Sequence, residues 1–209
     1  MSATTQNAKQ YWDERSELFG NYYQKPSLFD KVFRKGIFTR VAVALKTCRS
    51  LDNPTVLDIG SGPGINSVTL LKNSSATNVL GIDFAPSMIE YANRHAESEN
   101  VADQCEFIVG DFLDHDFDSV SFDLSIALGV LDYVEDAATF LKKMSDVSAK
   151  VFVVSWPENG VRMMLRNYRY DCPLYYYTEA DLRRLHDSCN VSKLEIVKSE
   201  GGWVTIAWK

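Results

Sequence analysis

The sequence predicts a single α/β domain in which helices cover a mostly parallel sheet. Apolar, β-branched runs alternate with helical patterns from residue 55 onward, which is typical of a parallel sheet wound with helices. Several of these runs are apolar almost throughout, as strands buried on both faces are. With 209 residues, 45% of them hydrophobic, the chain can fill one sizeable core. We therefore expect one domain over residues 1–209, with a core at 51–209 and an N-terminal helical cap at 1–50.

The expected strands follow from the apolar runs. A hairpin at the C-terminal end, "KLEIVKSEGGWVTIAWK", is expected to be antiparallel and to turn at Gly201 and Gly202. The five expected parallel strands cover residues 55–60, 78–84, 105–112, 122–130 and 149–156.

Helices are expected between these strands, where apolar residues recur at helical spacing. Pro86 suits the first turn of a helix, where its missing N–H costs nothing, and Thr178 suits an N-cap. The expected helices cover residues 65–73, 85–100, 137–147 and 178–188.

Residues 7–48 predict two or three amphipathic helices with many aromatic side chains. Aromatic residues at helical spacing usually belong to a core, but they would also suit a lid over the mouth of the sheet. Residues 25–49 are basic as well, which would steer an anionic small molecule, although solvated helix faces often look the same. The cations of this stretch are Lys25, Lys31, Arg34, Lys35, Arg40, Lys46 and Arg49.

Composition argues against several classes of protein. A net charge of -6 opposes binding to a nucleic-acid backbone, which needs a basic surface. No apolar run approaches the roughly 20 residues that span a bilayer, and the polar start lacks a secretory signal, so we expect a cytoplasmic protein. The four cysteines lack metal-like spacing, so we expect reduced thiols and no metal site.

The stretch "VLDIGSGPGINSV" is the main candidate for a ligand site. Gly60, Gly62 and Gly64 follow the first expected strand and allow a sharp turn with close backbone approach. Their spacing is not the GxGxxG of dinucleotide folds, and Pro63 removes an N–H that a phosphate would use. Asp58 places a negative charge beside the turn, which favours a ligand with a positive end over a pyrophosphate.

Two further acids follow the next two expected strands. Asp83 is placed to accept hydrogen bonds from ribose hydroxyls, although an acid here would also suit the start of the Pro86 helix. Asp111 is placed to accept from the exocyclic amine of adenine, although it could simply cap a turn. Phe112, with Phe84 or Met88, would flank the adenine ring.

The ordered set "VLDIGSGPG", "VLGIDFAPSM", "VGDF" and "FDLSIALGVLDYV" closely resembles the class I S-adenosylmethionine-dependent methyltransferases. Within them the chain is most similar to the small-molecule branch that includes ubiquinone-pathway and magnesium-protoporphyrin O-methyltransferases. The resemblance implies a Rossmann-like seven-stranded sheet in the order 3-2-1-4-5-7-6, with the last strand antiparallel. It also implies S-adenosyl-L-methionine as cofactor and a small-molecule methyl acceptor, with O-methylation slightly favoured over N- or C-methylation.

The resemblance also assigns roles to individual residues. The cofactor's methionine part would lie over the turn from Gly60 through Ser61 to Gly64, with Asp58 near its ammonium group. Asp83 would bind the ribose, and Asp111 with the Phe112 backbone would read the adenine edge. Leu128 and Gly129 would present backbone groups to the ammonium, and Arg40 would pair with the carboxylate, although no motif fixes that choice.

The sequence assigns no catalytic residue. Asp132, Tyr133 and His115 are weak candidates: a surface helix start would explain the first two, and a solvated loop the third. Weak candidates for acceptor binding lie in the aromatic cap and after the fifth strand, among them Tyr22, Tyr23, Arg162, Arg166, Arg169 and the run Tyr175 to Tyr177, which includes Tyr176.

Two other functions remain open on the residues alone. A nicotinamide-dependent oxidoreductase would share the first strand, its turn and Asp83, but it should carry GxGxxG. A non-catalytic partner or sensor protein that binds S-adenosylmethionine would keep the cofactor motifs without an acceptor pocket.

Overall fold

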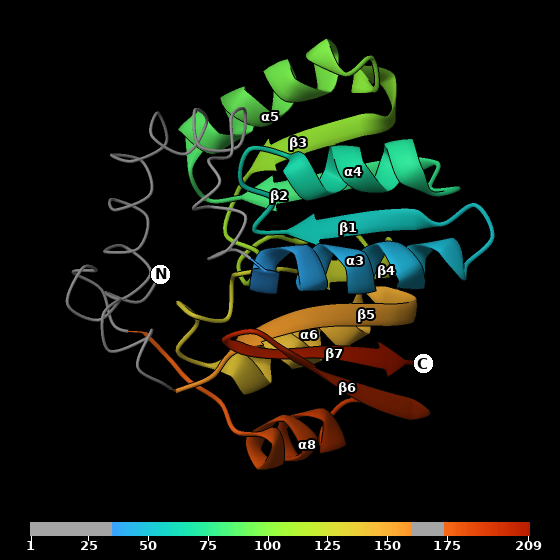
Figure 1. Ribbon diagram of the computed structural model, residues 1–209. Coiled ribbons are helices and arrows are strands. Elements are labelled where there is room, and N and C mark those ends of the chain that lie inside the picture. Colours follow the sequence, from blue (N-terminus) through green and yellow to red (C-terminus); the bar gives the residue numbers. More distant parts are fainter. Residues whose placement is uncertain (1–34, 160–173) are drawn as a thin grey trace.

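A seven-stranded sheet forms the centre of the molecule, in the order β3-β2-β1-β4-β5-β7-β6. The computed structural model describes residues 35–159 and 174–209 (Figure 1). The strands β1 to β5 run parallel, and β7 pairs antiparallel with both β5 and β6. The strands are β1 Thr55–Ile59, β2 Asn78–Asp83, β3 Cys105–Val109, β4 Phe122–Ala127, β5 Ser148–Pro157, β6 Lys193–Ser199 and β7 Gly202–Trp208. The predicted strand order and the antiparallel last strand are confirmed.

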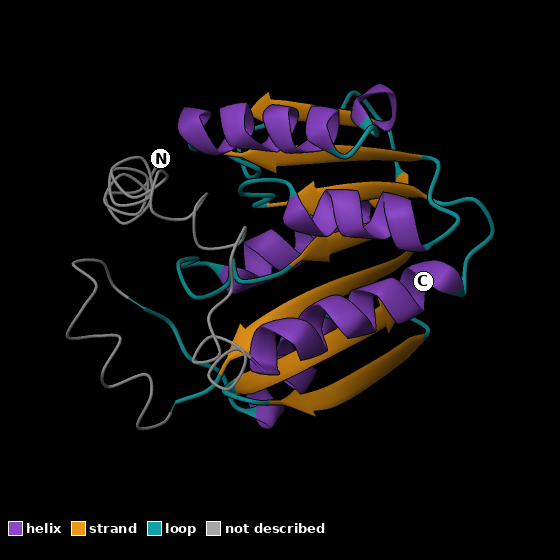
Figure 2. Ribbon diagram, turned by 45° about the horizontal axis from the view of Figure 1, so that its top comes forward, coloured by secondary structure: helices purple, strands orange, loops and turns teal. Residues whose placement is uncertain are grey.

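Helices cover both faces of this sheet (Figures 1 and 2). The first face carries α3, α4 and α5, and the second carries α6 and α8. Their bounds are α3 Lys35–Arg49, α4 Ile65–Asn73, α5 Pro86–Ser98, the short η1 Ala102–Gln104, α6 Ala137–Asp146 and α8 Glu179–Asp187. None of the helices in residues 35–159 and 174–209 is long and apolar enough to cross a membrane.

Local signals explain where these helices begin. Pro86 occupies the first turn of α5, as predicted. Thr178 caps α8 in a reciprocal pair with Asp181: each side chain bonds the other residue's backbone N–H. Asp136 caps α6 by accepting from the N–H of Thr139. The helix expected to start near Asp132 is therefore not there, and that interpretation is wrong.

Two strands end three residues before their predicted ends. The third strand ends at Val109 rather than at residue 112, because Asp111 accepts from the Leu113 N–H and turns the chain. The fourth strand ends at Ala127 rather than at residue 130, because Gly129 has a φ of +86° and leaves the extended conformation. The residues that follow these two strands therefore lie in loops at the carboxyl edge of the sheet.

The C-terminal hairpin also turns one residue earlier than predicted. Gly202 is already part of β7, and Glu200 and Gly201 form the turn. Gly202 pairs with Pro157 of β5, and a Cβ atom built on it would lie 1.9 Å from the Trp156 carbonyl oxygen. The glycine therefore allows two backbones to approach closely.

The order of the strands determines where a ligand can bind. The chain winds outward from β1 to β3 in one direction and from β4 onward in the other, so the helices diverge between β1 and β4. In sheets of this kind a crevice opens at this point, outside the carboxyl ends of the strands. The segments that follow β1, β2, β3 and β4 meet at this edge. Residues 1–34, most of the predicted cap, lie outside the described residues.

Candidate functional site

The glycine turn joins β1 to α4 at the carboxyl end of the sheet. Gly60, Gly62 and Gly64 all have positive φ values, of +67°, +52° and +73°. A Cβ atom on Gly60 would lie 2.4 Å from Val130 Cγ2, so the turn and the segment after β4 are in close contact. Gly62 differs from our expectation, because a side chain there would meet no atom within 4 Å and only its φ favours glycine.

The N–H groups of this turn are committed within the protein. Gly60 and Ser61 both donate to the Ile82 carbonyl, at 2.8 and 3.1 Å, and Gly64 donates to the Ser61 carbonyl at 3.0 Å. Gly62 donates to Asp83 Oδ2 at 2.9 Å, and Pro63 has no N–H. A phosphate group would find no free backbone N–H among residues 60–64, so the turn does not resemble a pyrophosphate site.

Asp58 lies at the centre of the site and is completely buried. Its Oδ2 accepts from Ser67 Oγ at 2.7 Å, whereas its Oδ1 has no hydrogen-bond partner among the described residues. Burial raises the pKa of Asp58 to about 7, with Asp83 adding to the rise and the Ser67 hydrogen bond opposing it. Buried acceptors in native folds nearly always have a donor, so Oδ1 is suited to a donor or cation from a ligand.

Asp83 ends β2 directly beside the turn. Its Oδ2 accepts from Gly62 N and its Oδ1 from Ala85 N, each at 2.9 Å. These bonds orient the carboxylate, and each oxygen keeps further acceptor capacity. Next to it, Phe84 is half-buried and Met88 is buried in the first turn of α5. The three residues lie at one end of β2. Their roles toward a ribose and an adenine stay a prediction.

Asp111 follows β3 in the neighbouring loop. Its Oδ1 accepts from the Leu113 N–H at 2.9 Å, so the turn that the sequence allowed is present. The Phe112 ring packs in the core against Phe140 of α6, with 4.9 Å between the ring centroids. Phe112 therefore suits the adenine site through its backbone better than through its ring.

The segment after β4 contributes backbone groups to the same edge. Ser155 Oγ accepts from the Gly129 N–H at 2.8 Å, so the group that Gly129 could offer a ligand is its carbonyl. Arg40 comes from α3, and its Nη1 would lie 3.7 Å from a Cβ atom on Gly129. The structure thus brings Arg40 to the site edge that the sequence suggested.

The weak candidates for acceptor binding and catalysis are placed only in part. Asp132 is 2% exposed, and its carbonyl accepts from the Tyr175 N–H at 2.9 Å. Tyr177 Oη donates to the Val134 carbonyl, and burial together with Asp132 raises the Tyr177 pKa well above its usual value. Tyr133 and Tyr176 are half-buried in the same two segments. Tyr22, Tyr23, Arg162, Arg166 and Arg169 lie outside the described residues.

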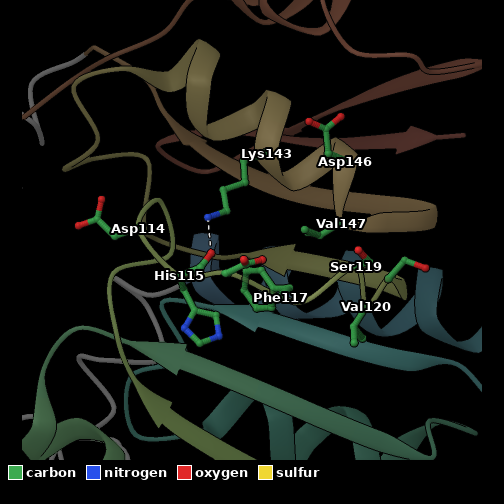
Figure 3. Close-up of a pocket in the computed structure, with 10 residues that line it drawn as sticks. Asp114, His115, Phe117, Ser119, Val120, Lys143, Asp146 and Val147 are labelled. Carbon is green, nitrogen blue, oxygen red and sulfur yellow. Dashed lines mark hydrogen bonds between the residues drawn. The ribbon is translucent and has the colours of Figure 1, made fainter.

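His115 faces a different part of the molecule. It lines a cleft of about 410 Å³ between residues 114–121 and α6, which the residues of the glycine turn do not line (Figure 3). Lys143 of α6 donates to the His115 carbonyl at 2.5 Å, and the imidazole packs edge-on against Phe117. The structure therefore groups His115 with α6 and not with Asp58 and Asp83.

Two serines support the site and were not identified from the sequence. Ser67 bonds Asp58 and Ser155 bonds Gly129, and both are completely buried. Ser67 lies in the first turn of α4, on the side that faces β1, and its polar character within an apolar pattern was the available signal. Ser155 similarly interrupts an apolar strand.

Part of the chain is similar in sequence to known methyltransferases. The family model for a methyltransferase domain matches residues 56–150. Tocopherol O-methyltransferase of Arabidopsis thaliana is 30% identical over 104 residues, which are 48% of this chain and 30% of that protein. Erythromycin 3''-O-methyltransferase of Saccharopolyspora erythraea is 32% identical over 92 residues, 44% of this chain and 30% of that protein. Other relatives are named as N- and C-methyltransferases. The chain thus aligns with less than a third of the length of the two relatives described.

The fold has a close match over the whole chain. Magnesium protoporphyrin IX methyltransferase from Synechocystis PCC 6803, solved with bound SAH (S-adenosylhomocysteine), superimposes with a TM-score of 0.77 at 17% identity. The match covers 98% of this chain and 98% of that one. At this identity it demonstrates a shared fold.

Proposed function

Since the chain belongs to the class I S-adenosylmethionine-dependent methyltransferases, we propose that it transfers a methyl group from S-adenosylmethionine to a small-molecule acceptor. The observation that carries the proposal is the buried Asp58 beside a glycine turn whose N–H groups are already used. Such a turn does not suit a phosphate, whereas an acceptor atom beneath it suits an ammonium group. The site therefore fits an adenosine with a cationic amino-acid tail.

The residues fit the parts of this cofactor in order. Asp58 Oδ1 and the carbonyls of Leu128 and Gly129 would bind the ammonium group, and Arg40 the carboxylate. Asp83 would bind the ribose hydroxyls, with Phe84 and Met88 beside the adenine. Asp111 and the Phe112 N–H would read the adenine edge. When bound, the cofactor supplies an electrophilic methyl group on a sulfonium.

The acceptor would lie between the segment after β4 and residues 174–177. There the chain's task is to hold a nucleophilic atom in line with the methyl group, which is the main requirement of such a displacement. We propose Asp132 as the group that takes the proton of an acceptor hydroxyl, because it is 2% exposed, its backbone carbonyl bonds Tyr175, and its carboxyl acts electrostatically on Tyr177. This placement, and the O-methyltransferases among the relatives, favour oxygen as the methylated atom.

The binding half of the proposal is tested by calorimetry with S-adenosylhomocysteine and with NAD. We expect S-adenosylhomocysteine to bind and NAD not to bind. The reverse result would favour a nicotinamide-dependent oxidoreductase and overturn the proposal.

The transfer half is tested with a methyl-labelled cofactor and fractionated metabolite extracts. We expect a labelled small molecule, and we expect Asp132→Asn to slow its formation by about 10²–10⁴-fold, the usual contribution of a general base. Asp146→Asn, at an exposed acid of α6, is the matched control. Binding without any transfer would instead indicate a non-catalytic sensor.

We also propose a reducing compartment such as the cytoplasm. The described cysteines Cys48, Cys105 and Cys189 are free thiols, and burial raises the pKa of each. Thiols of this kind persist where disulfides do not form. Labelling the chain with an organelle-specific probe would test the location.

A further inference from the structure

The Asp58 carboxyl is held on one side only. Ser67 Oγ donates to Oδ2 at 2.7 Å, and both residues are completely buried. Oδ1 has no hydrogen-bond partner in the part of the chain that the structure describes. Because the Ser67 hydroxyl holds Oδ2, the carboxyl cannot turn freely, and the direction of Oδ1 is fixed by a residue of α4.

This arrangement bears on the charge of Asp58. Desolvation and the neighbouring Asp83 favour the neutral acid, whereas the Ser67 hydroxyl favours the carboxylate. A cationic ligand group needs the carboxylate, so the serine and the ligand favour the same state of Asp58.

We infer that Ser67 is a positioning residue for the cofactor: its hydroxyl holds Asp58 Oδ2, favours the carboxylate over the neutral acid and directs Oδ1 at the cation of the ligand's amino-acid tail. The inference rests on the proposed function. Binding then removes the proton from those molecules in which Asp58 is neutral, and that proton passes to solvent. Cofactor affinity should therefore fall as the solution becomes acidic, and Ser67 should determine the pH at which it falls.

Other titratable groups surround the same turn and have to be separated from Asp58. Asp83 faces it from β2, and the Cys105 thiol of β3 has its pKa raised by burial and by the Asp58 charge. His95 of α5 places its Nδ1 3.3 Å from the Pro63 carbonyl oxygen. Because His95 places an imidazole against the turn, it needs its own variant.

The test is calorimetric titration of the full chain with S-adenosylhomocysteine from about pH 6 to about pH 9. For the wild type we expect the affinity to fall below neutral pH, by up to ~10-fold per pH unit. In Ser67→Ala the loss of affinity should begin at higher pH than in the wild type. This variant should therefore bind S-adenosylhomocysteine at least ~10-fold more weakly near neutral pH, but within ~3-fold of the wild type at the alkaline end. Ser67→Cys keeps a side chain of similar size with a weaker hydrogen-bond donor. Its affinity profile should lie between those of the wild type and Ser67→Ala.

Three further variants serve as controls. Asp58→Asn should bind with little dependence on pH in this range. Ser148→Ala removes another buried serine hydroxyl, at the amino end of β5 and away from the glycine turn, and should leave the profile unchanged. His95→Gln should leave the acidic fall in place. Buffers of different ionisation enthalpy should show proton release in the wild type and none in Asp58→Asn.

The outcomes separate this inference from the proposed function. If Ser67→Ala weakens binding equally at every pH, or not at all, Ser67 is merely structural and the inference is wrong while the proposed function stands. The same holds if the fall moves with His95. If the wild type binds no S-adenosylhomocysteine at any pH, both the inference and the proposed function are overturned.

Discussion

Two buried side chains make the stability of the free protein respond to pH in opposite directions. Burial raises the pKa of Asp58 to about 7, so the folded state binds a proton that the unfolded chain has released. Burial lowers the pKa of His186, so the folded state stays neutral where the unfolded chain is protonated. As the pH falls, Asp58 therefore adds stability between about 7 and about 4, whereas His186 removes it below about 6.5.

We predict that replacing either side chain reveals the contribution of the other. In Asp58→Asn the free energy of unfolding should fall as the pH is lowered from about 6.5 to about 5.5, with a slope of about 1 kcal/mol per pH unit. In His186→Gln it should rise over the same interval. Urea unfolding of the free protein at a series of pH values measures both slopes. Parallel profiles for the wild type and both variants would contradict the two assignments.

Asp83 should account for a measurable share of cofactor affinity. We predict that Asp83→Ala weakens S-adenosylhomocysteine binding by about 10- to 100-fold. The variant loses charge-assisted hydrogen bonds to the ligand, and the Gly62 N–H loses its acceptor. Asp103→Ala, at an exposed acid of η1, is the control in the same calorimetric experiment. Unchanged affinity in Asp83→Ala would show that the ribose is bound elsewhere.

The acids of the candidate site could be predicted from the sequence, whereas the side chains that hydrogen-bond or pack around them could not. Asp58, Asp83 and Asp111 each end or follow an apolar run, and the ends of parallel strands must meet at one edge. The Ser67 bond to Asp58 spans a strand, a turn and a helix, so it depends on how α4 packs on β1. The Phe112 ring turns into the core because α6 supplies Phe140, which no local pattern around residue 112 could indicate.

The close approach of β5 and β7 gives a prediction about a pair of adjacent elements. A methyl group on Gly202 would lie 1.9 Å from the Trp156 carbonyl oxygen, so Gly202→Ala must push the two strands apart. We predict a loss of roughly 2–3 kcal/mol or more in the free energy of unfolding, as overpacking of a core produces. Urea unfolding measures it.

The neighbouring glycine provides a matched control. Gly201 has a φ of +81°, and a side chain there would meet nothing within 4 Å. Gly201→Ala should therefore cost only the conformational strain, about 1–2 kcal/mol. Equal losses in the two variants would show that the pairing of Gly202 with Pro157 is not as tight as described.

For the whole molecule, the alternating pattern predicted the fold class, whereas the strand order came from the resemblance to a family. Apolar runs reveal that strands exist but not which strands are neighbours, since pairing depends on contacts between distant parts of the chain. The position of the hairpin turn was mispredicted for the same reason. Gly202 belongs to β7 and not to the turn, because its missing side chain allows close contact with β5, which the local sequence does not reveal. The proposed acceptor site depends most on such contacts, and the sequence offered no motif for its residues.

Two parts of the N-terminal segment should differ in their roles: α3 should be needed for stability, and residues 1–24 for the proposed activity. Ala44 and Cys48 of α3 are buried in the core beside β1 and β4, so removing residues 1–49 should abolish cooperative unfolding. Removing only residues 1–24 deletes the aromatic stretch "YWDERSELFGNYY" and leaves those core contacts in place. If these residues act as the lid that the sequence allows, the shorter variant should still unfold cooperatively in urea but lose most of the proposed methyl transfer, because a lid excludes water and orients the acceptor. Full turnover without residues 1–24 would contradict the lid and leave the strand edge itself as the complete site.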